Sequence, residues 1–297
     1  MGTYFNCYDL VKKVRMMLDE QSPQLQKGRD VSGRYSNDLI VDGINAAQRY
    51  FYALLMRRYP ALFFETVDLT AVSSVFTLPA DFGQLLYFKD SDGRQIFNIN
   101  EKYRKLTAST GSDRLYTRRG NTLVLDKGGL TSTCTLFYYR KPRDLDQGKA
   151  SAGAATSITL ATSAKMIVDY YNGMTIENDT QGWVDTISDY SITVADNGVR
   201  VATISETAAA NDYYGIVSDL PEMFHHLFVP QAVMNITGFY PRALEKPSQS
   251  GSVIFNENLR AALSAFTDNR LDRDPSGIID DWMETESLPY GIIMDGN

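Results

Sequence analysis

The sequence predicts an α+β fold in which N- and C-terminal helices pack as a bundle, an antiparallel β domain lies between them, and a small β module is inserted. Apolar residues repeat at helical spacing toward both ends of the chain, alternate in its middle, and are interrupted there by small polar stretches. With 297 residues, of which 43% are apolar, the chain can bury a substantial core.

Two amphipathic helices are expected near the N-terminus. The apolar face of the first consists of Leu10, Val11, Val14, Met17 and Leu18. The second should begin at a cap provided by Ser36 or Asn37 and end before Pro60. Its apolar stripe consists of Ile40, Ile44, Ala47, Phe51, Leu54 and Leu55. A polar connection between the two helices predicts an antiparallel pair.

Residues 62–142 have the pattern of a compact antiparallel β unit. Short extended runs are separated by turn signals such as Pro79. Residues 116–125 predict a hairpin with Gly120 and Asn121 as its two-residue turn. A further strand at 133–139 precedes Pro142.

Composition divides the chain into three parts. Small, polar residues without periodicity, at 147–157 and 206–210, flank a second β region and predict that 148–215 fold as an inserted β module. The main body then comprises 1–147 and 216–270. The remaining residues, 271–297, form an acidic C-terminal arm with seven Asp and Glu residues against a single basic one.

Helical patterns return after residue 218. Asp219 and Glu222 have the spacing of a capping box, and Pro221 fits a first helical turn. Pro230 should kink or restart this helix. The apolar face of a last helix consists of Phe255, Leu259, Ala262, Leu263 and Phe266. Helices therefore bracket the β structure.

The formal net charge of −7 argues against a tight grip on nucleic acid, which requires Lys and Arg placed to displace counterions from phosphates. No sequence-specific nucleic-acid binding is expected. No apolar run is long enough to predict a membrane span. Cys7 and Cys134 match no metal-ligand spacing, and two free thiols in a reducing compartment are the preferred interpretation, although a disulfide stays open.

The sequence carries no recognisable catalytic motif. It lacks a Gly-x-Ser-x-Gly elbow, a phosphate-binding loop and a His-Glu-x-x-His helix. His225 and His226 are adjacent, so on a helix they point about 100° apart and form neither a dyad nor a metal pair; one or both should be partly exposed. Asp280 and Asp281 are neighbours on an irregular arm, which does not supply two carboxylates at a fixed separation on a rigid frame. We therefore expect no enzyme activity, no cofactor and no metal site.

Four short strings follow one another along the chain: residues 39–49 (LIVDGINAAQR), 76–82 (FTLPADF), 139–142 (YRKP) and 219–227 (DLPEMFHHL). In this order they resemble the head-to-tail adaptor proteins of tailed phages. The resemblance covers roughly residues 1–145 and 216–270. Within the predicted insertion, residues 171–176, 186–190 and 201–204 resemble a β module of phage tail and adaptor proteins.

The resemblance implies a virion structural protein at the head–tail junction, synthesised in the host cytoplasm. It implies a ring, commonly of twelve copies, that connects the portal to the tail and lines the DNA passage. Its partners would be other copies of itself, the portal protein, a tail tube or nozzle protein and, through the insertion, a tail fibre. The C-terminal arm resembles extensions that reach portal subunits, with Trp282, Leu288, Tyr290, Ile292 and Ile293 as apolar anchors.

An alternative is a tail-associated receptor- or carbohydrate-binding protein whose insertion is the binding module. Five aromatic residues could form a face on which sugars stack, although buried strands explain them equally well: Tyr170, Tyr171, Trp183, Tyr213 and Tyr214.

Overall fold

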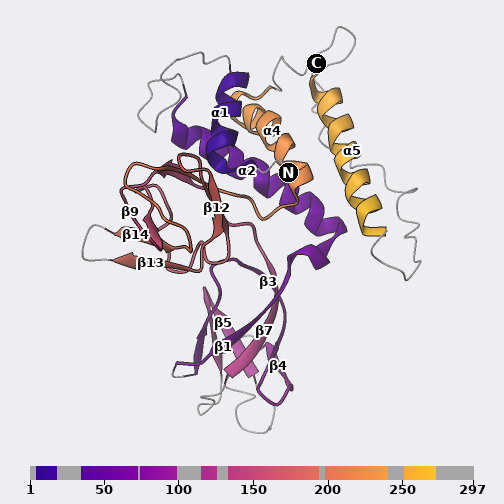
Figure 1. Ribbon diagram of the computed structural model, residues 1–297. Helices are drawn as coiled ribbons and strands as arrows, with labels where there is room; N and C mark the ends of the chain where they lie inside the picture. The colour runs from indigo at the N-terminus through magenta and orange to yellow at the C-terminus, as the bar shows by residue number, and fades with distance from the viewer. Residues whose placement is uncertain are drawn as a thin grey trace.

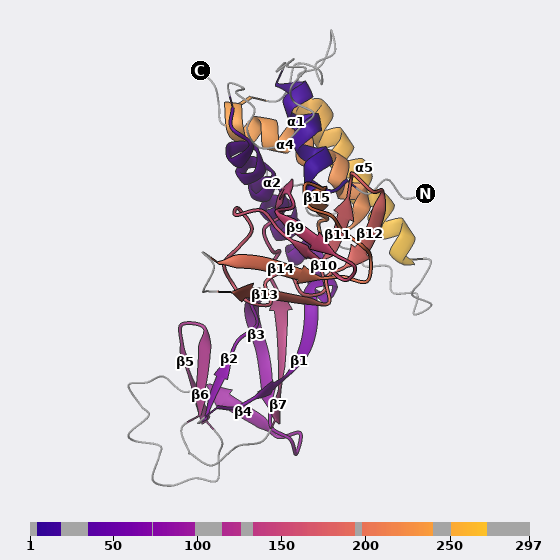
Figure 2. The ribbon, with the colours of Figure 1, turned by 60° about the vertical axis from the view of Figure 1, so that its left-hand side comes forward.

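The computed structural model describes residues 5–18, 35–72, 74–98, 115–125, 133–193, 198–239 and 251–271. Three helices lie side by side at one end of the molecule, a sheet projects from the other end, and two smaller sheets lie beside the helices (Figures 1 and 2). A fourth helix stands at the flank of the first three.

Side-chain caps mark the starts of the two N-terminal helices. Helix α1 spans Cys7–Met17 and is capped by Asn6, and α2 spans Asn37–Arg58 and is capped by Ser36, whose Oγ accepts from the Leu39 amide. Helices α4 (His225–Thr237) and α5 (Gly251–Leu271) complete the set. Short 3-10 turns, η2 (Pro60–Phe63) and η5 (Glu222–Phe224), follow α2 and precede α4.

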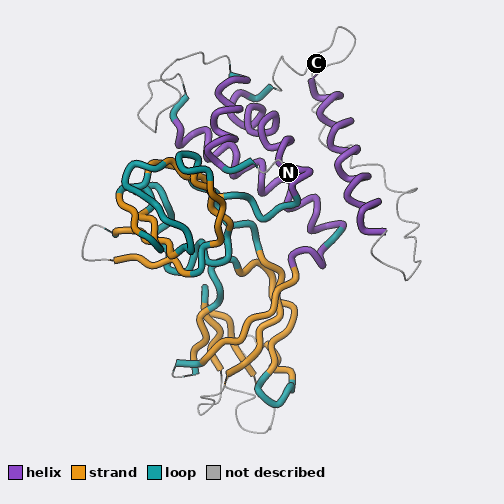
Figure 3. Tube along the Cα trace, viewed as in Figure 1, coloured by secondary structure: helices purple, strands orange, loops and turns teal. Residues whose placement is uncertain are grey.

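A seven-stranded sheet forms the projecting end (Figure 3). Its strands are β1 (Phe64–Thr70), β2 (Val75–Thr77), β3 (Phe82–Lys89), β4 (Gln95–Asn98), β5 (Leu115–Arg119), β6 (Thr122–Leu125) and β7 (Thr133–Arg140). Their order is β1-β7-β3-β4-β5-β6-β2, with β4 and β5 parallel. The sheet is nearly closed, because its first and last strands are consecutive in the chain and a bridge joins Val72 to Val75.

Two four-stranded sheets lie beside the helices. Their strands are β8 (Gln147–Lys149), β9 (Ala152–Ala154), β10 (Ser157–Thr159), β11 (Thr175–Asn178), β12 (Trp183–Thr186), β13 (Asp189–Thr193), β14 (Val199–Thr203) and β15 (Tyr213–Ile216). One sheet has the order β13-β14-β10-β9 and the other β12-β11-β15-β8.

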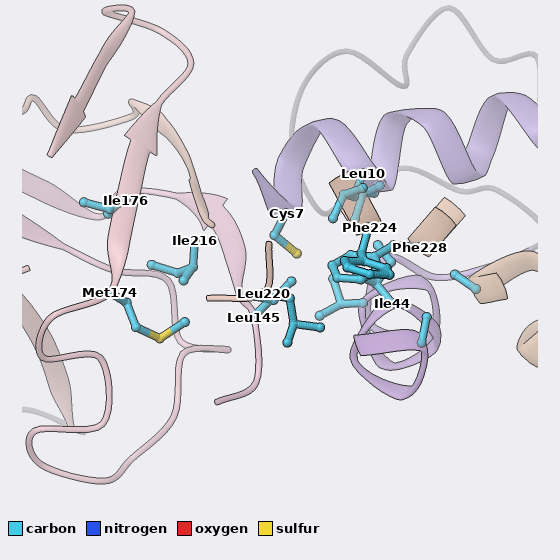
Figure 4. Close-up of a cluster of buried hydrophobic side chains, with 14 of the residues drawn as sticks. Cys7, Leu10, Ile44, Leu145, Met174, Ile176, Ile216, Leu220, Phe224 and Phe228 are labelled. Carbon is cyan, nitrogen blue, oxygen red and sulfur yellow. The ribbon is translucent and has the colours of Figure 1, made fainter. Parts of the chain in front are cut away.

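The buried side chains form two separate clusters. One fills the seven-stranded sheet alone and includes Phe76, Phe88 and Leu136. The other is shared by the helices and the two smaller sheets. Figure 4 shows this continuity: Met174, Ile176 and Ile216 lie on the strand side, Leu145 and Leu220 in the middle, and Ile44, Phe224 and Phe228 on the helical side. The small sheets therefore depend on the helices for part of their core.

The predicted fold class is wrong. The described residues contain four α-helices against fifteen strands, and no bundle of N- and C-terminal helices forms the framework. A large, mostly β portion, with a nearly closed seven-stranded sheet and two further sheets, takes that place. The sequence misled because strands of three to five residues in 147–216 are too short to show an extended alternation, so the β content was underestimated.

Of the predictions made from local sequence signals, some are confirmed and others are wrong. The hairpin turn at Gly120 and Asn121 is confirmed, with Arg119 paired to Thr122 and Gly120 at φ +56°. The capping box is not formed, since no side chain caps η5 or α4. Helix α4 also continues through Pro230 without restarting. The division of the chain at 148–215 stays a prediction.

Candidate interaction surfaces

Buried polar side chains of α2 hold the segment that links the large sheet to the small ones. The Asn45 amide donates to the Leu145 carbonyl (3.1 Å) and accepts from the Leu145 amide (2.7 Å). Gln48 donates to the Arg143 carbonyl (2.8 Å) and accepts from the Ser218 hydroxyl (2.6 Å). Two side chains one helical turn apart thus satisfy buried backbone groups of an irregular segment.

An ion cluster lies at the same junction. Asp219 Oδ2 accepts from Arg143 Nη2 at 3.2 Å and lies 3.5 Å from Arg140 Nη1. Arg143 also donates to the carbonyls of Tyr170 and Asn172, and its side chain is 8% exposed. Residues from the large sheet, the linking segment and the approach to α4 therefore meet around one carboxylate.

A second carboxylate, Asp144, bridges α2 and the loop after β10. Arg49 binds Oδ1, and Lys165 Nζ lies 2.8 Å from Oδ2. Burial raises the pKa of Asp144, but hydrogen bonds from Lys165 and Arg49 outweigh it and hold the pKa below its usual value. The hydrogen bond to Asp144 also raises the pKa of Lys165. Both groups are charged at neutral pH.

The start of helix α1 packs against β11 and β15 of the smaller sheets. Asn6 caps α1 by accepting from the Asp9 amide and donates to Glu177. The Tyr8 ring stacks on Tyr213, with ring centroids 5.5 Å apart. Burial and the nearby Asp179 raise the pKa of Tyr8 to about 12. The described start of the chain is thereby locked onto the smaller sheets.

The outer face of the large sheet carries three partly exposed aromatic residues and a lysine. We call this surface the aromatic face; it consists of Phe64 of β1, Phe137 of β7, and Tyr87 and Lys89 of β3. Phe137 stacks on Tyr87 (4.3 Å between centroids) and lies 6.2 Å from Phe64, which is 42% exposed. The Lys89 Nζ lies 5.1 Å from the Phe137 ring centroid. This face lies opposite the buried cluster of the sheet, so neither core cluster of the described residues accounts for its aromatic residues.

A second apolar surface, which we call the apolar loop, is formed by Met166, Ile167 and Val168 between β10 and β11. These residues are consecutive and 50–59% exposed. Their backbone is fixed, because the Lys165 amide donates to the Tyr171 hydroxyl and the Tyr190 hydroxyl donates to the Lys165 carbonyl. A fixed loop that presents three apolar side chains to solvent is typical of a contact site.

The described residues offer little for chemistry. None of them forms a group of three or more His, Cys, Asp and Glu residues that could hold a metal ion. His226 is exposed, whereas His225 is buried and its Nε2 donates to the Leu220 carbonyl at 2.9 Å. Burial lowers the pKa of His225, which is therefore neutral at pH 7. Cys7 and Cys134 are both buried and are not joined by a disulfide, in agreement with two thiols; the reducing compartment stays a prediction.

The residues predicted for the portal-binding arm and for the sugar-stacking face have different outcomes. Trp282, Leu288, Tyr290, Ile292 and Ile293 lie outside the described residues. Of the proposed sugar-stacking face, Tyr170, Tyr171 and Tyr214 are core residues at 7%, 1% and 0% exposure. Trp183 donates to the Thr207 carbonyl, and Tyr213 is covered by Tyr8. The five aromatic residues therefore form no common exposed face.

Sequence reasoning missed the polar junction and both exposed apolar surfaces. Asn45 and Gln48 interrupt the apolar stripe of α2 at i and i+3, and this interruption was the signal available for the junction. The apolar loop was visible as a three-residue apolar run in a region of small polar residues. The aromatic face had no local signal, because alternation does not say which side of a strand faces solvent.

Within the described residues, no helix is both long and apolar enough to cross a membrane. A search of curated proteins finds no match. The SU10 adaptor protein family matches residues 5–164, more than half of the chain. This match supports the resemblance to phage adaptors, and with it a structural component of a virion; the likeness of the insertion to a phage β module stays a prediction. The extent of the match shows that the chain belongs to the SU10 adaptor protein family.

Proposed function

We propose that the protein forms a ring that joins the portal to the tail of a phage virion and lines the passage for DNA. The observation that carries this proposal is the family match over residues 5–164. The order of the four adaptor-like strings points the same way. An adaptor acts through its surfaces, and a structural role without catalysis agrees with the family.

The exposed apolar surfaces support assembly. Phe64 and the apolar loop stay exposed in the single chain, and apolar surface of this kind is covered when copies associate. Identical subunits that contact one another through two different surfaces close into a ring when the rotation allows it. The net charge of −7 suits a conduit through which DNA passes without being held.

The acidic arm, 271–297, is proposed to reach the portal protein. It combines seven acidic residues with the apolar anchors Trp282, Leu288, Tyr290, Ile292 and Ile293, a composition suited to a segment that orders on docking. Residues 148–215 are proposed as a docking module for a tail fibre or a neighbouring tail protein. The tail tube or nozzle protein would meet the opposite end of the ring.

Electron microscopy of the purified protein, alone and mixed with portal, tests the proposal. A ring stacked on the portal is expected, and class averages would give its copy number. A chain truncated after residue 270 should still form rings but lose its place on the portal. A protein that stays monomeric and does not bind portal would overturn the ring and the connector role together.

The receptor- or carbohydrate-binding alternative loses its structural basis. Its aromatic residues could have formed a stacking face or belonged to buried strands, and three of the five lie in the core. Absence of glycan binding by the whole protein is the expected result.

A further inference from the structure

Charge is unevenly distributed between the large sheet and the small sheets. The described residues of 64–142 include six Lys and Arg against five Asp and Glu, a net charge of +1. The described residues of 143–220 include four Lys and Arg against ten Asp and Glu, a net charge of −6. The two parts would attract each other if they came from neighbouring copies.

Each part also carries one of the exposed apolar surfaces. The aromatic face carries Lys89, which makes no ion pair with any described residue, and Asp68, which accepts from the Thr135 hydroxyl. The apolar loop lies in the acidic part, between Lys165, which is paired with Asp144, and Asp169. Both surfaces are therefore apolar, and Lys89 has the opposite charge to the acidic part that carries the loop.

The apolar loop is built to keep its shape on contact. Besides the bonds at Lys165, the Asp169 amide donates to the Tyr190 carbonyl at 2.9 Å, so the backbone is tied at both ends of the apolar triplet. Met166 also packs closely on Gly198, the residue before β14. A Cβ atom added to Gly198 would lie only 2.7 Å from Met166 Cε. A surface that is already ordered loses little conformational entropy when it docks.

Resting on the proposed ring, we propose that the apolar loop (Met166–Val168) of one copy docks on the aromatic face (Phe64, Tyr87, Phe137, with Lys89) of the next copy. The two surfaces are different, so the contact is head-to-tail. Each copy binds one neighbour through its apolar loop and the other neighbour through its aromatic face. The occupant of the aromatic face is a second copy of this chain.

Mixed cross-linking tests the contact directly. Lys89→Cys protein is mixed with Ile167→Cys protein under mild oxidation, and a disulfide-linked heterodimer is expected. Lys89→Cys mixed with Met16→Cys serves as the control, because Met16 is more exposed than Ile167, at 74% against 50%, but lies on α1. The native Cys7 and Cys134 are fully buried and should not compete.

Affinity provides a second measurement. Ile167→Asp places a charge at the centre of the contact and should weaken self-association by tenfold or more, roughly the effect of losing one strong interface residue. Met16→Asp should leave self-association unchanged. Circular dichroism and thermal unfolding check that each variant folds, which is expected because both positions are exposed.

The outcomes separate this contact from the ring itself. Rings that form without the specific cross-link, and that tolerate Ile167→Asp, would refute the contact and leave the proposed function standing. A wild-type chain that is monomeric with and without portal would refute both.

Discussion

Replacing Asn45 with alanine should strongly destabilise the junction between α2 and the segment that leads into the small sheets. Asn45 is 5% exposed, and its amide is bonded to both backbone groups of Leu145. Leu145 is itself buried, at 2% exposure, so water cannot take over these bonds. The substitution therefore leaves one buried N–H and one buried C=O without partners.

The magnitude follows from those two groups. Each buried polar group left unsatisfied costs about 1–3 kcal/mol. Alanine returns about 0.5 kcal/mol through its higher helix propensity. The free energy of unfolding should therefore fall by about 2–5 kcal/mol.

Urea unfolding followed by far-UV circular dichroism measures this loss, and hydrogen exchange at the Leu145 amide reports whether it is local. Asn256→Ala on the exposed side of α5 is the matched control and should change stability by less than about 0.5 kcal/mol. If Asn45→Ala also stays within about 0.5 kcal/mol of wild type, the polar junction does not hold the two parts together as argued.

Three further expectations concern single positions. Burial lowers the pKa of His225, so the folded state takes up a proton at this residue less readily than the unfolded state does. The contribution of neutral His225 to the free energy of unfolding is therefore complete above about pH 6.5, the pKa of an unperturbed histidine. It is lost as the pH falls from there through the lower pKa of the folded protein. Unfolding at pH 8 and pH 5 should show this loss, and His225→Gln, which keeps a donor for the Leu220 carbonyl, should reduce it. Gly215→Ala would place a Cβ 2.6 Å from Asn6 Oδ1 and 2.7 Å from the Tyr8 amide, so it should displace the start of α1 and cost about 1–3 kcal/mol in thermal unfolding; an unchanged melting temperature would contradict this close packing. Ser36→Ala removes the cap of α2 and should cost about 1 kcal/mol, which Ser36→Asp should restore.

The predictions that held depend on signals within a few residues. A cap at Ser36 and a proline at position 60 bound α2, and the Gly120 and Asn121 pair sets the register of the β5–β6 hairpin. These preferences act through local backbone geometry, so they survive whatever the rest of the chain does. The resemblance to phage adaptors is supported by the match over residues 5–164, which includes three of the four short strings, whereas the likeness of the inserted β module stays a prediction.

The predictions that failed depended on partners far away in the sequence. Asp219 was assigned to a capping box with Glu222, but it binds Arg140 and Arg143, more than 70 residues earlier. The local geometry of a cap and a long-range ion pair compete for the same carboxylate, and only the folded chain decides between them. The sequence pattern of Asp219 is compatible with both.

By itself, then, the sequence determined the ends of α2, the hairpin turn and the adaptor resemblance, because each is encoded in residues that are neighbours in the chain. The tertiary structure alone decided the balance of the fold, in which the seven-stranded sheet has its own core and the small sheets share theirs with the helices. It also decided which aromatic residues are buried, as Tyr214 is, and which stay exposed, as Phe64 does. A strand shows two faces, and only packing against other elements selects the one that is covered.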